Sequence, residues 1–317
     1  MTFRDGLGIG RLAAVASTGC AFFVAASVVP ASLQAQVIVN DSFTDGGRDN
    51  GADPLDTNWW TSSSLQAIEV SPGSLGFVTG SSGRGIHTVF PTQSLSNVGD
   101  KLVARYTFRT PDTVGPTTGA GVFRVGLFDT LGRAELNGEV ESSSGEPNSL
   151  YGYFATSTAA LPGYMMDMDL GTGTEDLNFR QHNTAQTAST PTGRLMGTTT
   201  GFTSLSPTGP DGAYTFTPNT TYTGSLSITR LNATDMELTG TLGTATHTVT
   251  DTFDSDDFGM LAFWANSGVF GSSSVPDTAD NGIDFSNVTI EVIPVPEPAS
   301  LSLLALGLGL AARRRRA

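Results

Sequence analysis

The chain has 317 residues, of which 16 are Lys or Arg and 30 are Asp or Glu, so its formal net charge at pH 7 is −14. Six of the basic residues lie near the two ends, at Arg4, Arg11 and positions 313–316, so the middle of the chain is more acidic still. Such a surface repels phosphate, which excludes nucleic acid as an expected partner. The single cysteine, Cys20, lies in an N-terminal apolar run that we expect to be removed, which excludes disulfides, thiol nucleophiles and thiolate metal sites from the exported part.

Residues 1–35 have the pattern of a secretory signal peptide. Two arginines precede an apolar run at 12–29, which is followed by a proline and then by small residues. We expect signal peptidase to cut after Ala35, with Ala31 and Ala26 as alternative sites.

Strands are predicted through most of residues 36–293. At 101–109 every second residue is apolar and the residues between them are polar or charged, which is the pattern of a half-buried strand. In 283–292 the apolar phase slips by one residue, which predicts a bulge at 286–287. The same reasoning gives strands at 122–128, 222–229, 235–241 and 244–250, and a central strand at 258–264, which is apolar on both faces.

Turn-forming Gly, Pro and Asn residues separate about a dozen such strands. The sequence therefore predicts an all-β fold, a two-sheet antiparallel jelly-roll sandwich flanked by an N-terminal signal helix and a C-terminal hydrophobic anchor helix. A stretch of about 260 residues is too long for one immunoglobulin-like domain. We expect a signal peptide at 1–35, the sandwich at 36–293 and a sorting segment at 294–317.

The predicted sorting segment consists of a short polar motif, an apolar stretch and a basic end. The apolar stretch at 301–312 is shorter than the roughly 20 residues that span a bilayer unaided. The basic end predicts that the C-terminus lies in the cytoplasm and the rest of the chain outside. The residues of the signal are Pro296, Glu297, Pro298, Arg313, Arg314, Arg315 and Arg316.

This tail, from Val295 to Arg316, resembles the PEP-CTERM sorting signal of Gram-negative and related bacteria. The resemblance implies export through the Sec route, transient anchoring in the inner membrane and cleavage near Pro296–Glu297–Pro298 by an exosortase-type membrane protease. The protein would then lie on the cell surface or outside the cell.

The predicted sandwich resembles the concanavalin A-like lectin and glucanase superfamily. The resemblance rests on an opening strand at 37–43, an acidic loop that leads through Asp56 to Trp59 and Trp60, and a closing strand at 283–292. It implies that the first and last strands pair within one sheet. An unrelated β-sandwich remains the alternative.

A catalytic role is tested by the acidic residues of the strand expected at 164–170. Retaining glucanases of the superfamily carry two glutamates and an aspartate on alternate residues, because nucleophile and acid lie about 5 Å apart across one sugar. Here Asp167 and Asp169 share a face, but Met165 stands where a further carboxylate is expected. We therefore predict that the protein is not an enzyme. A solvent-facing acidic pair and a calcium contact are the remaining interpretations, and a divergent glycan-active hydrolase is the alternative function.

An acidic loop near the start of the sandwich is a candidate calcium site. Its carboxylates lie among Gly and Asn residues, and such a loop can surround a hard cation with oxygen ligands, although the spacing is not that of an EF-hand. A solvated connection between two strands is the alternative. The candidate ligands are Asp41, Asp45, Asp49, Asp53 and Asp56.

The adjacent tryptophans Trp59 and Trp60 are the candidates for stacking on a sugar ring. Neighbouring residues of a strand point to opposite faces, so one of the two must face outward. Together with Asp167 and Asp169 they form the candidate glycan site. The sequence thus predicts an exported, non-catalytic surface or extracellular-matrix protein, with glycan binding, to exopolysaccharide for example, as one hypothesis and protein adhesion as another.

Overall fold

The structure of the protein is a computed structural model. It describes residues 34–48, 55–61, 68–71, 73–77, 79, 83–115, 121–133, 136, 161–170, 177–182, 196–197, 199, 201–205, 215–266, 269–270 and 282–295. The two predicted terminal helices lie outside the described residues. Within the described part of the chain, no helix is long and apolar enough to cross a membrane.

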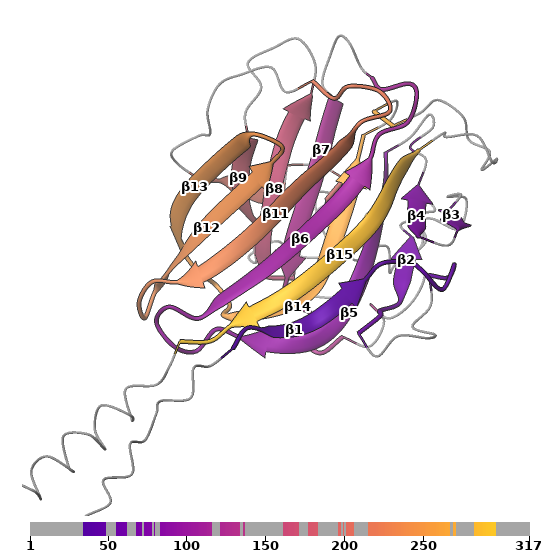
Figure 1. The fold of residues 1–317 in the computed structure, drawn as a ribbon. Helices are drawn as coiled ribbons and strands as arrows, with labels where there is room; N and C mark the ends of the chain where they lie inside the picture. Colours follow the sequence, from indigo (N-terminus) through magenta and orange to yellow (C-terminus); the bar gives the residue numbers. More distant parts are fainter. Residues whose placement is uncertain are drawn as a thin grey trace, which may run out of the picture. The chain divides into compact units, whose positions relative to one another are not determined.

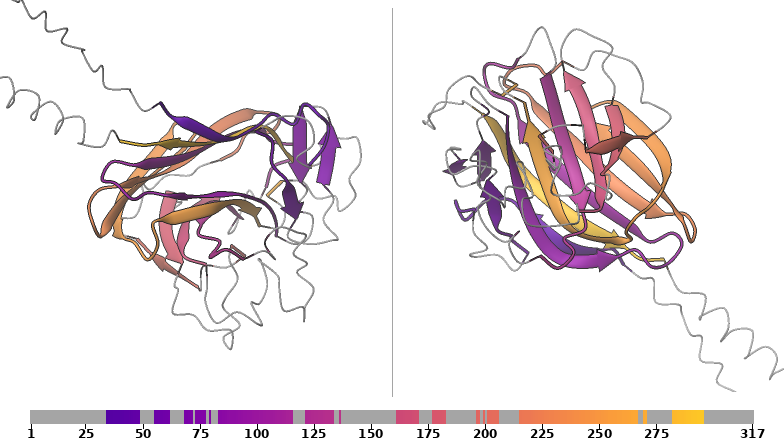
Figure 2. Two further views of the ribbon diagram at one scale, coloured as in Figure 1. Left: turned by 90° about the horizontal axis from the view of Figure 1, so that it is seen from below. Right: turned by 180° about the vertical axis from the view of Figure 1, so that it is seen from behind.

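Fifteen described strands form two antiparallel sheets that face each other (Figures 1 and 2). The eight-stranded sheet has the order β13-β12-β11-β6-β15-β4-β3, with β1 also paired to β15. Its strands are β1 (Gln36–Asp41), β3 (Ile68–Ser71), β4 (Ser74–Phe77), β6 (Lys101–Arg109), β11 (Thr221–Arg230), β12 (Asp235–Leu242), β13 (Ala245–Thr252) and β15 (Ile283–Ile293).

The seven-stranded sheet has the order β10-β9-β8-β7-β14-β5-β2. Its strands are β2 (Trp59–Thr61), β5 (Arg84–Ser94), β7 (Gly121–Phe128), β8 (Gly163–Leu170), β9 (Leu177–His182), β10 (Phe202–Ser204) and β14 (Asp257–Ala265). The prediction of a two-sheet antiparallel sandwich is confirmed. Every strand predicted by alternation is present, with end points shifted by a residue or two.

The first and last strands of the sandwich pair as expected. Gln36 lies opposite Val292 and Asp41 opposite Val288. The predicted slip in the last strand is confirmed as well, because the register of β15 against β6 shifts between Phe285 and Asn287.

Aromatic side chains from both sheets fill the space between them. Phe108 of β6 lies 5.4 Å from Phe123 of β7, and Phe263 of β14 lies 4.5 Å from Phe285 of β15, measured between ring centroids. All four rings are buried. The alternating pattern of each strand places these rings inward and leaves Thr and Ser on the outer face of the eight-stranded sheet.

The seven-stranded sheet buries its outer face too. A second apolar cluster lies there, which explains why β14 is apolar on both faces and sits between β7 and β5. Its buried members are Val122, Phe128, Leu136, Leu161, Met165, Met196, Met260, Ala262 and Trp264. Three of them, Leu136, Leu161 and Met196, lie between strands, so these three residues cover part of the sheet.

Candidate functional site

The candidate acid Asp167 lies between two arginines on the outer face of the seven-stranded sheet. Register places Arg124 of β7 directly opposite Asp167 of β8. One carboxylate oxygen accepts from Arg124 Nε at 2.7 Å and the other from Arg180 Nε at 2.7 Å. Only 2% of the Asp167 side chain is exposed, so it does not face solvent as one sequence interpretation has it.

Arg124 joins this ion-pair group to the residues that cover the sheet. Its Nη1 donates to the carbonyl oxygen of Met196 at 2.6 Å, and its guanidinium lies 4.9 Å from the ring centre of Trp264. The ion pair of Arg124 and Asp167 is therefore held under an apolar cover, and Arg180 is half-buried at its edge. The backbone of Asp169 pairs with Val122 on the same strand pair, and its side chain lies outside the described part of the structure.

Two buried histidines donate hydrogen bonds to residues that cover the outer face of this sheet. A ring nitrogen of His87, Nε2, donates to the carbonyl of Leu136 at 3.0 Å, and Nδ1 of His182 donates to the carbonyl of Leu161 at 2.7 Å. Burial lowers the pKa of His182, so its ring is neutral near pH 7. Arg124, His87 and His182 thus each donate to the main-chain carbonyl of one residue between strands.

The two tryptophans lie on opposite faces of β2, as alternation requires. Trp59 is 1% exposed and packs against Phe43 and Phe263 in the core, so protein covers its ring. Trp60 is half-buried and stacks on His87 with ring centroids 5.6 Å apart. Trp60 is the one of the pair whose ring is partly open to solvent.

Asp41 is the first residue of the candidate calcium loop, and both of its carboxylate oxygens accept hydrogen bonds from other residues of the protein. One of its oxygens accepts from the indole Nε1 of Trp59 at 2.8 Å and the other from the amide of Phe43 at 2.9 Å. Burial raises the pKa of Asp41, and the two hydrogen bonds partly offset that rise. Its carboxylate therefore anchors the start of the loop to the core.

The other candidate calcium ligands are not brought together in the described residues. Asp45 accepts the amide of Gly47 at 3.0 Å, a local loop contact. Asp49 and Asp53 lie outside the described residues, and Asp56 lies close enough to Asp41 to raise its pKa. In the described ranges no group of three or more His, Cys, Asp or Glu side chains is placed to hold a metal ion, so calcium remains a prediction.

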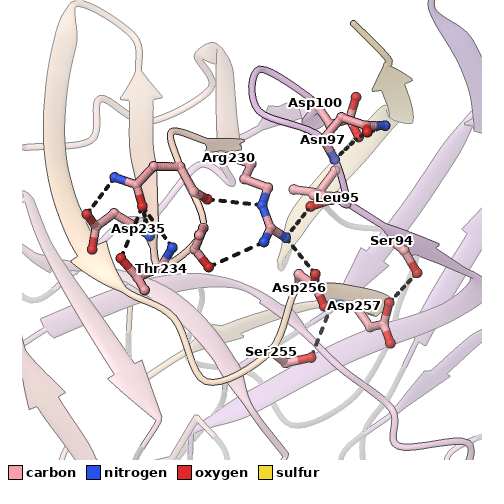
Figure 3. Close-up of polar contacts among 12 residues, drawn as sticks. Ser94, Leu95, Asn97, Asp100, Arg230, Thr234, Asp235, Ser255, Asp256 and Asp257 are labelled. Atoms are coloured by element: carbon pink, nitrogen blue, oxygen red, sulfur yellow. Dashed lines mark hydrogen bonds and ion pairs between the residues drawn. The ribbon is translucent and has the colours of Figure 1, made fainter. Parts of the chain in front are cut away.

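A polar group at one end of the sandwich holds the residue that precedes the predicted Pro-Glu-Pro signal. The carboxylate of Asp100, in the turn between β5 and β6, accepts the amide of Val295 at 3.0 Å. Arg230 supports this turn, as Figure 3 shows. In the sequence, 97–100 carries only the signal of a turn, and nothing in it indicates a contact with a residue 195 positions away. Residues 296–317, with the candidate residues Pro296 to Pro298 and Arg313 to Arg316, lie outside the described part of the chain.

Comparison with known proteins identifies the C-terminal segment. Residues 294–316 match the family model described as the PEP-CTERM protein-sorting motif. No curated protein matches the chain significantly.

Several solved structures are similar to the sandwich at low identity. One is the carbohydrate recognition domain of Emp46p in its metal-free form, with a TM-score of 0.43 and 12% sequence identity over 73% of this chain and 87% of that chain. Another is the endo-1,3-beta-glucanase of Streptomyces sioyaensis, with a TM-score of 0.45 and 11% identity over 84% of this chain and 98% of that chain. The exoplasmic/lumenal domain of VIP36 in its Ca²⁺/Man-bound form is a third, with a TM-score of 0.42 and 9% identity over 80% of this chain and 88% of that chain. These neighbours have the legume-lectin-like and glucanase jelly-roll folds of the concanavalin A-like type. The chain itself combines a two-sheet antiparallel β-sandwich with a PEP-CTERM protein-sorting motif, which begins at the residue after its last strand.

Proposed function

We propose that the protein is an exported, non-catalytic β-sandwich of the cell surface or extracellular matrix, and that an exosortase-type membrane protease sorts it. The observation that carries the proposal is the position of the motif. Residues 294–316 follow β15 directly, so the membrane-directed signal is joined to the last strand of the sandwich. Before processing, the C-terminus would lie in the cytoplasm and the sandwich outside the inner membrane.

The contacts of Asp167 support the non-catalytic part of the proposal. A general acid or nucleophile must reach a substrate atom within hydrogen-bond distance. Both oxygens of Asp167 are instead taken by Arg124 and Arg180, and the side chain lies under the apolar cover of the sheet. Asp167 thus serves the packing of this face, in our proposal, and a hydrolase would need carboxylates from elsewhere.

Glycan binding is the finer proposal for the partner, and Trp60 is its best candidate residue. A sugar ring stacks on a flat aromatic surface that solvent can reach. Trp60 is partly exposed, and His87 stacks on one face of its ring, which leaves the other face as the candidate for a sugar. Exopolysaccharide of the matrix in which a sorted protein would reside is the glycan class that fits this hypothesis.

Sorting is tested by expressing the full chain in a Gram-negative host with and without an exosortase. We expect shortening of the chain and its release from the inner membrane only where the exosortase is present. Glu297→Ala should abolish this shortening, and Asp112→Ala, a change at an exposed position of the sandwich, should leave it intact. Full-length protein in both hosts would contradict the proposal.

Ligand binding is tested by the melting temperature of the exported protein with calcium, with EDTA and with a panel of bacterial and algal polysaccharides. A ligand that prefers the native state raises the melting temperature. A rise with one polysaccharide that Trp60→Ala removes would support glycan binding, and a rise with calcium would support the acidic loop. Release of reducing sugar would overturn the non-catalytic proposal, and no rise with any ligand would favour adhesion to protein.

A further inference from the structure

The turn between β5 and β6 has a backbone that only glycine adopts easily. Gly99 has φ +93°, in the left-handed region. The amide of Asp100 donates to the carbonyl of Asn97 at 3.0 Å and closes the turn. The turn therefore presents the side chain of Asp100 in a fixed direction.

Asp100 uses its two carboxylate oxygens for different tasks. Oδ2 accepts from the amide of Asn97 at 2.7 Å and from its Nδ2 at 3.2 Å, which ties the carboxylate to its own turn. Oδ1 accepts the amide of Val295 at 3.0 Å. Asp100 is 4% exposed and Val295 is 36% exposed, so the carboxylate is buried and the bond is part-buried.

Gly99 contributes space to the same contact. A Cβ atom at this position would lie 2.5 Å from Cγ2 of Val295, well inside contact distance. With any larger residue at this position the Val295 side chain must shift. We call Gly99 and Asp100, the two residues of the turn that meet Val295, the Val295 clasp.

Arg230 binds the clasp through its main chain, and its guanidinium binds Leu95 and Asp256 (Figure 3). Its amide donates to the carbonyl of Asp100 at 2.9 Å, and its carbonyl accepts the amide of Gly99 at 2.7 Å. Its guanidinium binds the carbonyl of Leu95 at 2.8 Å and the carboxylate of Asp256 at 2.6 Å. The clasp thus belongs to the rigid part of the sandwich, because it is joined to β11 and to the turn before β14.

The clasp grips the beginning of the sorting motif. The motif starts at residue 294, so Val295 is its second residue and Pro296 follows at once. A protease binds several residues on each side of the cut in extended form, and native structure must open locally before it can do so. A residue held against the sandwich is unavailable until its hydrogen bond breaks.

We propose that Asp100 is a positioning residue for the sorting cleavage, and that release of Val295 from the clasp limits its rate. This inference rests on the proposed function. The cleavage is hydrolysis of one peptide bond near Pro296, in which water supplies OH to the new carboxyl group and H to the new amino group. The clasp takes no part in that chemistry and controls only the access of the protease.

The first test follows processing of the full chain by pulse-chase in a host with an exosortase. Loss of a charge-assisted hydrogen bond in Asp100→Ala should speed cleavage about tenfold. Asn97→Ala is the matched control, because it removes one bond to the same carboxylate and keeps the bond to Val295. We expect it to be processed at close to the rate of the unaltered chain. Equal rates for all three chains, or slower cleavage of Asp100→Ala, would overturn the inference.

Gly99→Ala opens the clasp by a different route and keeps the test decisive if Asp100→Ala does not fold. It should speed processing in the same direction, and the melting temperature of each variant shows whether the sandwich is intact. Unchanged processing of a folded Gly99→Ala chain would contradict the inference.

A second measurement separates this inference from the proposed function. A proline-specific endoprotease that cuts after Pro296 is added to the purified full chain in detergent, without exosortase. Faster cutting of Asp100→Ala than of Asn97→Ala supports the clasp even if the exosortase leaves the unaltered chain uncut, a result that would defeat the proposed function alone. Equal cutting of the two variants would overturn the clasp.

Discussion

Asp167 is a charged residue on the outer face of β8. Other residues cover that face, so its side chain is buried and hardly contacts solvent. Its charge is acceptable there because Arg124 and Arg180 lie on the two neighbouring strands, each at 2.7 Å. Burying the charges of Asp167 and Arg124 is costly, and the cost is offset only while every partner is present. The group therefore fixes how β7, β8 and β9 align more than it adds stability.

Removal of the Asp167 charge should leave two arginines without their counter-ion. We expect Asp167→Asn to lower the free energy of unfolding by about 3 kcal/mol, measured by urea denaturation. The matched control is Asp112→Asn at an exposed position, with an expected change within about 0.5 kcal/mol. Equal stability of the two variants would show that the ion-pair group contributes nothing to the fold.

His182 makes stability depend on pH in a direction that follows from its burial. Its pKa is lowered below 6.5 in the folded state, so on acidification the unfolded chain binds a proton before the folded one does. The contribution of His182 is fully present above about pH 6.5 and is lost as pH falls through that value toward the lowered folded pKa. His182→Asn keeps a donor for the carbonyl of Leu161 and does not titrate. Urea denaturation at pH 7.5, 6 and 5 should show a smaller loss of stability in the variant, and parallel losses would argue against this origin.

At the scale of the element, glycines inside strands make room for large core side chains. Gly224 of β11 lies opposite Tyr106 of β6, and a Cβ atom there would collide with the Tyr106 ring. Gly240 of β12 has the same relation to Met166, across the sandwich. These glycines interrupt the apolar alternation of their strands in the sequence. The structure explains them, because a side chain of the neighbouring strand or of the other sheet occupies the space where a Cβ atom would lie.

Gly224→Ala should therefore destabilise the protein although alanine is the better strand former. Overpacking of this kind costs about 1–3 kcal/mol, measured as a shift of the urea midpoint. Thr223→Ala, one residue away on the exposed face, is the comparison and should shift it much less. A neutral Gly224→Ala would mean that Tyr106 has room to move.

β15 joins three other strands and is the element on which the eight-stranded sheet depends. It pairs with β1, β4 and β6. We expect a chain that ends at residue 295 to unfold cooperatively in urea, and a chain that ends at residue 282 to lack such a transition. Far-UV circular dichroism typical of a folded β-protein in the shorter chain would contradict this expectation.

At the scale of the whole molecule, patterns within single strands were enough to predict the fold from the sequence. They were not enough to predict the contacts of the candidate site. Alternation predicted the strands and the slip at 286–287 predicted the bulge, because each depends on a few neighbouring residues. The pairing of the first and last strands was expected only from the resemblance to the concanavalin A-like superfamily. The motif at 294–316 was equally local.

The cover of the seven-stranded sheet depends instead on contacts between distant segments. Arg124, Asp167 and Met196 meet from three parts of the chain, and Asp100 meets Val295 across 195 residues. A charged residue in an otherwise apolar strand, such as Arg124 in β7, is the one signal that could have indicated a buried ion pair. Its partner could not be chosen from several acidic residues without the register.

The pairing of Gln36 with Val292 means that the chain enters and leaves the sandwich at one end, and the other ends of the strands form the opposite end. Nine-residue strands such as β6 separate these ends by about 30 Å. A fluorescent or affinity label at Asp112, at the far end of β6, would therefore point away from any surface to which the C-terminus is fastened. The same label next to Gln36 would lie close to that surface. Comparing the accessibility of the two labels would therefore measure the orientation of the sandwich relative to the surface.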